Sequence, residues 1–119
     1  MCTRKENNMI AILKMKAWGD FDEPYDINVA AGDAQSVSEI CTTLNNYCSM
    51  LPGCGQDIRL SKYLEDDDYA ERLVNMLTVF SRFSENQAID FVAELNRLCN
   101  GINVCVYKDT FSVDNIIQI

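Results

Sequence analysis

The sequence predicts one small α+β domain, with a mainly antiparallel sheet and about three helices in the order ββαβααβ. Three observations lead to this prediction. Segments that alternate apolar and polar residues indicate strands, and amphipathic segments with capping signals indicate helices. The 119 residues, 48% of them hydrophobic, suffice for one core. We expect the domain to cover residues 9–119, and residues 1–8, which are polar, to form a flexible N-terminal extension.

The first two elements are predicted to be paired strands. In residues 9–18, Leu13, Met15 and Ala17 fall on one side of the alternation, and Ile12, Lys14 and Lys16 on the other. Residues 19–24 are rich in turn formers, and residues 25–30 alternate again. The two segments therefore predict a β-hairpin joined by an acidic loop.

A helix is predicted to follow the hairpin. Ser36 stands three residues before Glu39, which is the spacing of a capping box, and Pro52-Gly53 provides a stop. Apolar residues recur at helical spacing between these signals: Val37, Ile40, Cys41, Leu44, Tyr47, Cys48 and Leu51.

The second half of the chain predicts one strand, two helices and a final strand. Residues 57–63 alternate and indicate a strand, and Asp68, with Glu71 at the third helical position, is expected to cap the next helix. Ser84 and Gln87 form another capping box, and Asn100-Gly101 offers a left-handed stop. Residues 102–108 read as the clearest strand, whereas residues 111–119 form a short apolar tail of no assigned type.

The chain is strongly acidic, with 18 Asp and Glu against 10 Lys and Arg and a net charge of −8. No basic residue occurs from Ala17 to Ile58. Phosphate recognition requires a positive footprint, so the charge argues against direct binding of nucleic acid and of anionic membranes. No apolar stretch is long enough to span a membrane and no secretory segment opens the chain, so we expect a cytoplasmic protein.

No motif in the chain predicts catalysis or a cofactor. Histidine is absent, and neither a phosphate-binding loop nor an EF-hand spacing occurs. The six cysteines are interpreted as reduced, buried hydrophobes. Four alternatives stay open: a zinc site, a catalytic Cys54, a disulfide between Cys48 and Cys54, and a divalent ion bound by the acids of residues 65–68. We expect a protein that is not an enzyme, with neither a metal nor a cofactor.

The candidate site is a set of carboxylates that could imitate DNA phosphates, which follow one another with a rise of about 3.4 Å per strand along the helix axis. Asp90 and Glu94 are spaced i, i+4 and repel each other, which a purely structural helix would have little reason to keep. Two simpler interpretations compete: general solubility, and helix capping by the acids near residue 68. The candidate partner-binding residues are Asp20, Asp22, Glu23, Asp26, Glu65, Asp66, Asp67, Asp68, Glu71, Asp90 and Glu94.

Four segments within about residues 62–95 share a pattern of apolar and acidic positions: Lys62-Tyr63-Leu64-Glu65-Asp66-Asp67-Asp68-Tyr69, Leu73-Val74-Asn75-Met76-Leu77, Phe83-Ser84-Glu85-Asn86-Gln87 and Phe91-Val92-Ala93-Glu94-Leu95. This pattern resembles the central region of ArdA-type antirestriction proteins. The resemblance implies a DNA-mimicking inhibitor of restriction enzymes, encoded by a mobile element and commonly a homodimer. The acids that lie on the matched stretch are those at positions 65, 66, 67, 68 and 71.

Three hypotheses of function follow. The first is an inhibitor whose carboxylates occupy the basic DNA-binding groove of a host restriction or CRISPR enzyme. The second is an adaptor or oligomerising module that binds through apolar surface at Trp18, Phe21 and residues 111–119. The third is a thiol- or metal-dependent enzyme or sensor. Binding that weakens steeply with salt would separate the first hypothesis from the second.

Overall fold

The computed structural model describes residues 9–117, so the predicted extension of residues 1–8 lies outside the described part of the chain. The α+β prediction is confirmed: one antiparallel sheet of three strands, in the order β2-β1-β3, lies beside four helices. The elements along the chain are β1 (Met9–Trp18), β2 (Pro24–Asp33), α1 (Ala34–Ser49), α2 (Leu60–Leu64), α3 (Asp67–Phe80), α4 (Glu85–Cys99) and β3 (Phe111–Ile117).

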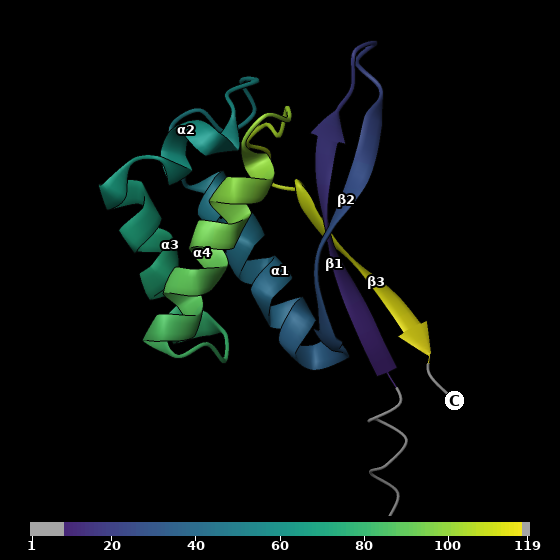
Figure 1. Cartoon of the computed structure of the whole chain (residues 1–119), viewed down its shortest axis with the longest axis vertical. Helices are drawn as coiled ribbons and strands as arrows, with labels where there is room; N and C mark the ends of the chain where they lie inside the picture. The colour runs from purple at the N-terminus through teal and green to yellow at the C-terminus, as the bar shows by residue number, and fades with distance from the viewer. Residues whose placement is uncertain (1–8, 118–119) are drawn as a thin grey trace, which may run out of the picture.

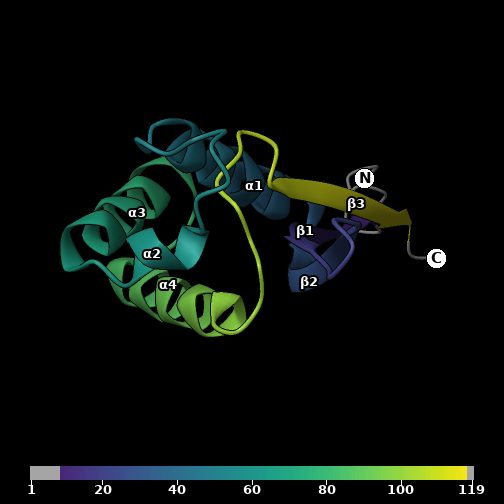
Figure 2. The ribbon, with the colours of Figure 1, turned by 90° about the horizontal axis from the view of Figure 1, so that it is seen from above.

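The molecule has two layers, with the helices on one side of the sheet (Figures 1 and 2). Helix α1 contacts all three strands and also α3, and α3 contacts α4. The core therefore runs from the inner face of the sheet through α1 into the space between the other helices. Among the helices formed by residues 9–117, none combines the length and the apolar character that crossing a bilayer requires.

Strand β1 is the centre of the sheet, and its predicted alternation is confirmed. Leu13, Met15 and Ala17 are fully buried against the helices, whereas Lys14 and Lys16 are partly exposed on the opposite face. Strand β2 pairs with β1 as the predicted hairpin, with a register shift between Leu13 and Lys14. Such a shift is a β-bulge, which increases the local twist of the sheet.

Helix α1 buries the predicted apolar face, but its first residue differs from the prediction. The cap is Asp33, whose Oδ2 accepts a hydrogen bond from the backbone N–H of Ser36 at 3.1 Å. Ser36 therefore lies inside the first turn instead of before it. The helix ends at Ser49, three residues before the Pro52-Gly53 stop.

The strand predicted over residues 57–63 is wrong. Residues Leu60–Leu64 form the short helix α2, in which Leu60, Tyr63 and Leu64 are buried. The spacing of these three residues is i, i+3, i+4, so the segment satisfies a helical period as well as an alternation. Seven residues were too few to separate the two periods.

The strand predicted over residues 102–108 is also wrong. Val104, Cys105 and Val106 are buried in succession, so the segment is a covered connection, and its only bridge within the described chain joins Cys105 to Arg59. The third strand is instead β3, in the tail that had no assigned type. It pairs antiparallel with β1, with Val113 opposite Leu13.

The ends of α3 and α4 test three further predictions. Helix α3 is capped by Asp66 and not by Asp68, because Asp66 is the residue with extended backbone before the first turn. The capping box of Ser84 and Gln87 at the start of α4 is confirmed. The stop is confirmed as well, since Gly101 has a φ of +88°.

Candidate acidic face and pocket

All eleven candidate carboxylates are on exposed residues, and they lie in three places. The first group is in the turn between β1 and β2 and at the start of β2, the second is at the corner between α2 and α3, and the third is on α4. Figure 1 shows the β1–β2 turn and α2 toward the same end of the molecule, whereas α4 runs along the helical layer. The structure therefore does not gather all eleven acids into one patch.

Most of the candidate acids have no cation beside them. The four salt bridges within residues 9–117 join Lys14 to Asp114 at 2.6 Å, Lys16 to Asp109 at 3.9 Å, Arg82 to Glu39 at 3.2 Å, and Arg97 to Glu94. Glu94 is the only candidate among these partners. In the described chain, the other ten candidate carboxylates are exposed without an ion pair, so their charge faces solvent.

The acids of the α2–α3 corner have a structural role in part. Oδ1 of Asp66 accepts hydrogen bonds from the backbone N–H groups of Asp68 at 2.9 Å and Tyr69 at 3.3 Å. Asp67 and Asp68 stand in the first turn of α3, where the helix dipole favours negative charge. Helix capping therefore explains these three acids without a partner, and it does not explain Glu65 or the turn acids.

The repulsion expected between Asp90 and Glu94 is offset by a cation that the sequence argument left out. Arg97 donates hydrogen bonds to both carboxylate oxygens of Glu94, one of them at 2.9 Å. This bond lowers the pKa of Glu94 below its ordinary value. Glu94 is therefore the candidate least available to a partner.

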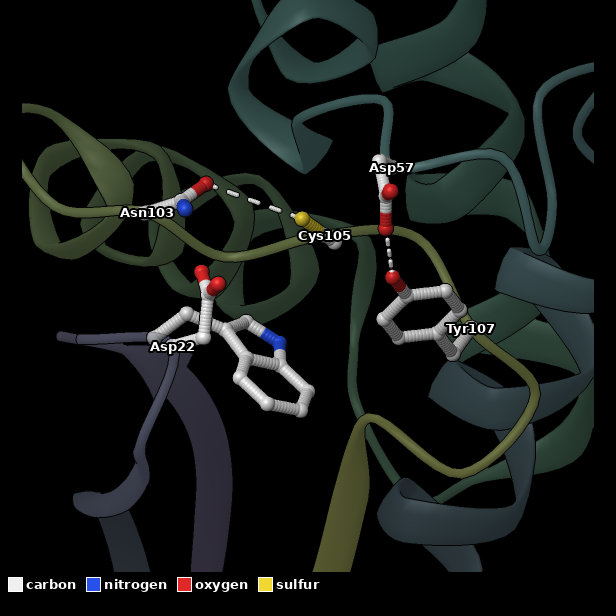
Figure 3. Close-up of a pocket in the computed structure, with 6 residues that line it drawn as sticks. Asp22, Asp57, Asn103, Cys105 and Tyr107 are labelled. Carbon is white, nitrogen blue, oxygen red and sulfur yellow. Dashed lines mark hydrogen bonds between the residues drawn. The ribbon is translucent and has the colours of Figure 1, made fainter. Parts of the chain in front are cut away.

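A pocket of about 370 Å³ opens between three segments of the chain. These are the β1–β2 turn, the loop that precedes α2 and the loop that precedes β3. Its lining combines two carboxylates, two aromatic rings, an amide and a thiol (Figure 3): Trp18, Asp22, Asp57, Asn103, Cys105 and Tyr107. The backbone N–H of Trp18 donates to the carbonyl of Asn103 at 2.8 Å, which holds the end of β1 against the last loop. Asp22 was one of the candidate carboxylates predicted from the sequence, and Trp18 belonged to the apolar surface of the second hypothesis. The other residues come from distant segments, and no sequence signal brings these together.

Two hydrogen bonds and one ring contact fix the pocket wall. The Tyr107 hydroxyl donates to the carboxylate of Asp57, and this bond raises the pKa of the phenol. The rings of Trp18 and Tyr107 meet edge to face, with centroids 6.4 Å apart and an interplanar angle of 80°. Of the described residues that line the pocket, none is cationic. The site therefore has a net negative, aromatic lining.

The backbone at both pocket carboxylates is in the left-handed region. Asp22 has a φ of 58° and Asp57 a φ of 57°, and they are the two non-glycine residues with positive φ in the described chain. Aspartate tolerates this region better than most residues because its short polar side chain can bond locally. Both carboxylates are therefore held in position by a left-handed backbone that few other non-glycine residues adopt readily.

The thiols of the core are held in the protonated form. Burial raises the pKa of Cys48 and of Cys99 to about 12 in each case, and burial together with the charge of Asp57 raises the pKa of Cys105. Cys48 and Cys54 are both free thiols. Within residues 9–117, no group of three or more Cys, Asp or Glu residues is arranged to hold a metal ion.

Comparison with family models, with curated proteins and with solved structures found no match for this chain. Evidence for the function of this chain therefore comes from its own acidic residues and pocket.

Proposed function

We propose that this chain is a non-catalytic binding protein whose exposed carboxylates occupy the basic, nucleic-acid-binding groove of a protein partner, such as a restriction or CRISPR enzyme. The observation that carries the proposal is the exposure of ten candidate acids without an ion pair, while four of the cations of residues 9–117 are neutralised elsewhere. A surface carboxylate that has no ion pair can bind a new cation without first breaking an existing salt bridge.

The placement of the charge favours binding over general solubility. Solubility requires only net charge, wherever it lies. Here the acids form two separate clusters, because the β1–β2 turn lies at the tip of the sheet and the α2–α3 corner lies at the far side of the helical layer (Figure 1). Each cluster produces a local field of one sign, which attracts a basic surface and raises its association rate.

The test compares three variants that each remove three negative charges. Asp66→Asn, Asp67→Asn and Asp68→Asn together neutralise the corner, and asparagine keeps a capping oxygen at position 66. Asp20→Asn, Asp22→Asn and Glu23→Gln neutralise the turn. The matched control is Glu85→Gln, Asp109→Asn and Asp114→Asn, which changes acids outside the candidate set.

Each protein is immobilised and exposed to a bacterial lysate, and captured proteins are eluted with salt and, separately, with double-stranded DNA. The Debye length falls from about 10 Å at about 0.1 M salt to about 3 Å at about 1 M, so an electrostatic complex should dissociate across this range. We expect a DNA-binding protein that DNA displaces, with capture reduced in the turn and corner variants and kept in the control. Equal capture by all four proteins, or a partner that binds DNA and this chain together, would refute the proposal.

A second candidate function, an adaptor that binds through apolar surface, is favoured by one observation. Phe21 is 87% exposed at the tip of the β1–β2 turn. The rest of the predicted apolar surface is reduced, since Phe111 is buried in the core and Trp18 is partly buried in the pocket wall. Capture that resists salt and is lost in Phe21→Ser would support the adaptor instead.

A further inference from the structure

We infer that the pocket between the β1–β2 turn and the loops at Asp57 and Asn103 binds a guanidinium group, supplied by an arginine side chain of the basic partner. The inference rests on the proposed function for the source of the arginine, and on the pocket itself for the chemistry. A volume of about 370 Å³ exceeds what one planar head group requires. The pocket also falls in the range of about 300–1,000 Å³ that is typical of small-ligand sites.

The two carboxylates approach the pocket from different sides. In Figure 3, Asp22 projects upward from the turn toward the space beside Asn103, and Asp57 reaches down from the opposite loop. Asp57 receives the Tyr107 hydroxyl on Oδ1, which leaves Oδ2 as an acceptor. The Asp22 side chain forms no hydrogen bond or salt bridge with any other residue in the range 9–117. Both groups therefore have lone pairs available for a ligand that carries several donors.

A guanidinium matches this arrangement better than other cations. It is planar, carries five N–H donors in a fixed fork, and stacks on aromatic faces, whereas an ammonium offers three donors around a point. Trp18 and Tyr107 supply two perpendicular rings, one of which can lie under the plane of the fork. The same rings would contribute little to a hydrated metal ion. Although Cys105 also lines the pocket, the described chain has no group of three or more Cys, Asp or Glu residues arranged to hold a metal ion.

The positions of the carboxylates are set before a ligand arrives. Both aspartates stand at left-handed backbone positions in turns. The hydrogen bond from Trp18 to Asn103 joins the strand end to the loop that carries Cys105 and Tyr107. A site whose acceptors are already fixed loses less conformational entropy on binding. Uncommon backbone conformations of this kind gather at functional sites.

Trp18 makes the test direct, because it is the only tryptophan in the chain and it lines the pocket. Its fluorescence is titrated with N-acetyl-arginine methylamide at constant ionic strength. The comparison probes are the lysine analogue and the citrulline analogue, which has the same shape as arginine without the charge. We expect saturable binding of the arginine probe, weaker binding of the lysine probe, and no saturable response to citrulline.

The variants separate the pocket from the general charge. Asp22→Asn should lower the affinity for the arginine probe about tenfold, which is the effect of removing one charge-assisted hydrogen bond. Asparagine tolerates the same left-handed backbone, so the turn is kept. Asp20→Asn is the matched control, since Asp20 is exposed in the same turn and does not line the pocket. Tyr107→Phe provides a second variant, which leaves the Asp57 carboxylate without its phenol and should also change the affinity. Circular dichroism verifies the fold of each protein.

The inference is overturned if the arginine probe does not bind, if citrulline binds as well as arginine, or if Asp20→Asn weakens binding as much as Asp22→Asn. Tight binding of calcium or manganese that displaces the arginine probe would also overturn it, in favour of a metal site. These outcomes are independent of the capture experiment. If the arginine probe does not bind but salt-sensitive capture of a partner is observed, the pocket inference fails and the acidic-face proposal stands. If the probe binds but no such partner is captured, the proposed partner is rejected and the pocket inference stands.

Discussion

The side-chain amide of Asn45 forms two hydrogen bonds with the backbone of Phe111. Its Nδ2 donates to the Phe111 carbonyl at 2.9 Å, and its Oδ1 accepts from the Phe111 N–H at 3.0 Å. The Asn45 side chain in α1 thus pairs with both backbone groups of Phe111, the first residue of β3, as the backbone of a neighbouring strand would. This contact fixes where the last strand begins and holds the strand against the helical layer.

Replacing Asn45 should destabilise the protein and affect β3 first. Asn45→Ala leaves two partly buried backbone groups without partners, and each such group costs about 1–3 kcal/mol. Asn45→Asp keeps the acceptor for the Phe111 N–H but loses the donor, so its loss should be intermediate. Urea denaturation measures the free energy of unfolding, and hydrogen exchange at β3 locates the change. Equal stability of the two variants would contradict this role.

The amide contact also shows why the sequence did not reveal β3. The local sequence around residues 111–117 gives little indication of a strand. The groups that hold this strand in place, Asn45 and the central strand β1, are distant in sequence. In contrast, β1 and the α4 capping box were predictable because their signals are local: an alternation and a three-residue spacing. The segment around Val104 misled because successive buried residues suit a covered loop as well as a strand.

The candidate site was predictable to a similar extent. Exposure of the acids followed from their charge, and Asp22, one of the candidate carboxylates, lines the pocket. Its neighbours in the pocket, Asp57 and Tyr107, are about fifty residues apart in sequence and meet only through the fold. The ion pair of Glu94 with Arg97 was present in the spacing i, i+3 and was overlooked.

Asp66 should affect stability through its hydrogen bonds and not through its charge. Asp66→Ala removes the acceptor for two N–H groups at the start of α3 and should cost about 1 kcal/mol. Asp66→Asn keeps an acceptor and should cost much less. Thermal unfolding of the two variants tests this directly. If asparagine were as harmful as alanine, the corner variant proposed above would need to omit this position.

Asp33 should make stability depend on acid pH. The hydrogen bonds from Ser36 lower the pKa of the Asp33 carboxyl below its ordinary value of 3.8. Folding therefore favours the carboxylate, so this contribution is complete above the ordinary pKa and is lost as the pH falls through the lower, folded-state value. Melting temperatures of the parent protein and Asp33→Asn, measured between about pH 6 and about pH 2, should converge at the acid end. A constant difference between the two proteins across this range would contradict the prediction.

The buried thiols should resist alkylation in the folded protein. Because burial raises the pKa of Cys48 and Cys99 to about 12, almost no thiolate exists at about pH 8. We expect iodoacetamide to modify these two residues only in denaturant, as read by peptide mass spectrometry. Cys54, which is half-buried, is the internal comparison. Modification of Cys48 in the native protein at the rate seen in denaturant would contradict the burial argument.

Gly53 should not accept a side chain. A methyl group there would overlap Ile58 and approach the Tyr63 hydroxyl to 2.8 Å, and that hydroxyl already accepts the Gly53 N–H at 2.9 Å. Overpacking of this kind costs about 1–3 kcal/mol, so Gly53→Ala should lower the melting temperature. Gly32→Ala is the control, since its added methyl would meet Val37 at an ordinary 3.7 Å. Similar melting temperatures for the two variants would show that the loop can adjust.

The strand order β2-β1-β3 sets the sequence of events when the chain is made. The hairpin of β1 and β2 leaves the ribosome before β3, so one edge of β1 has no partner until β3 follows, roughly a hundred residues later at the pair Leu13 and Val113. Contacts between residues so distant in sequence slow folding. Until β3 has been synthesised, an apolar strand edge is open to mispairing with other nascent chains, so expression level and chaperone supply should govern the soluble yield.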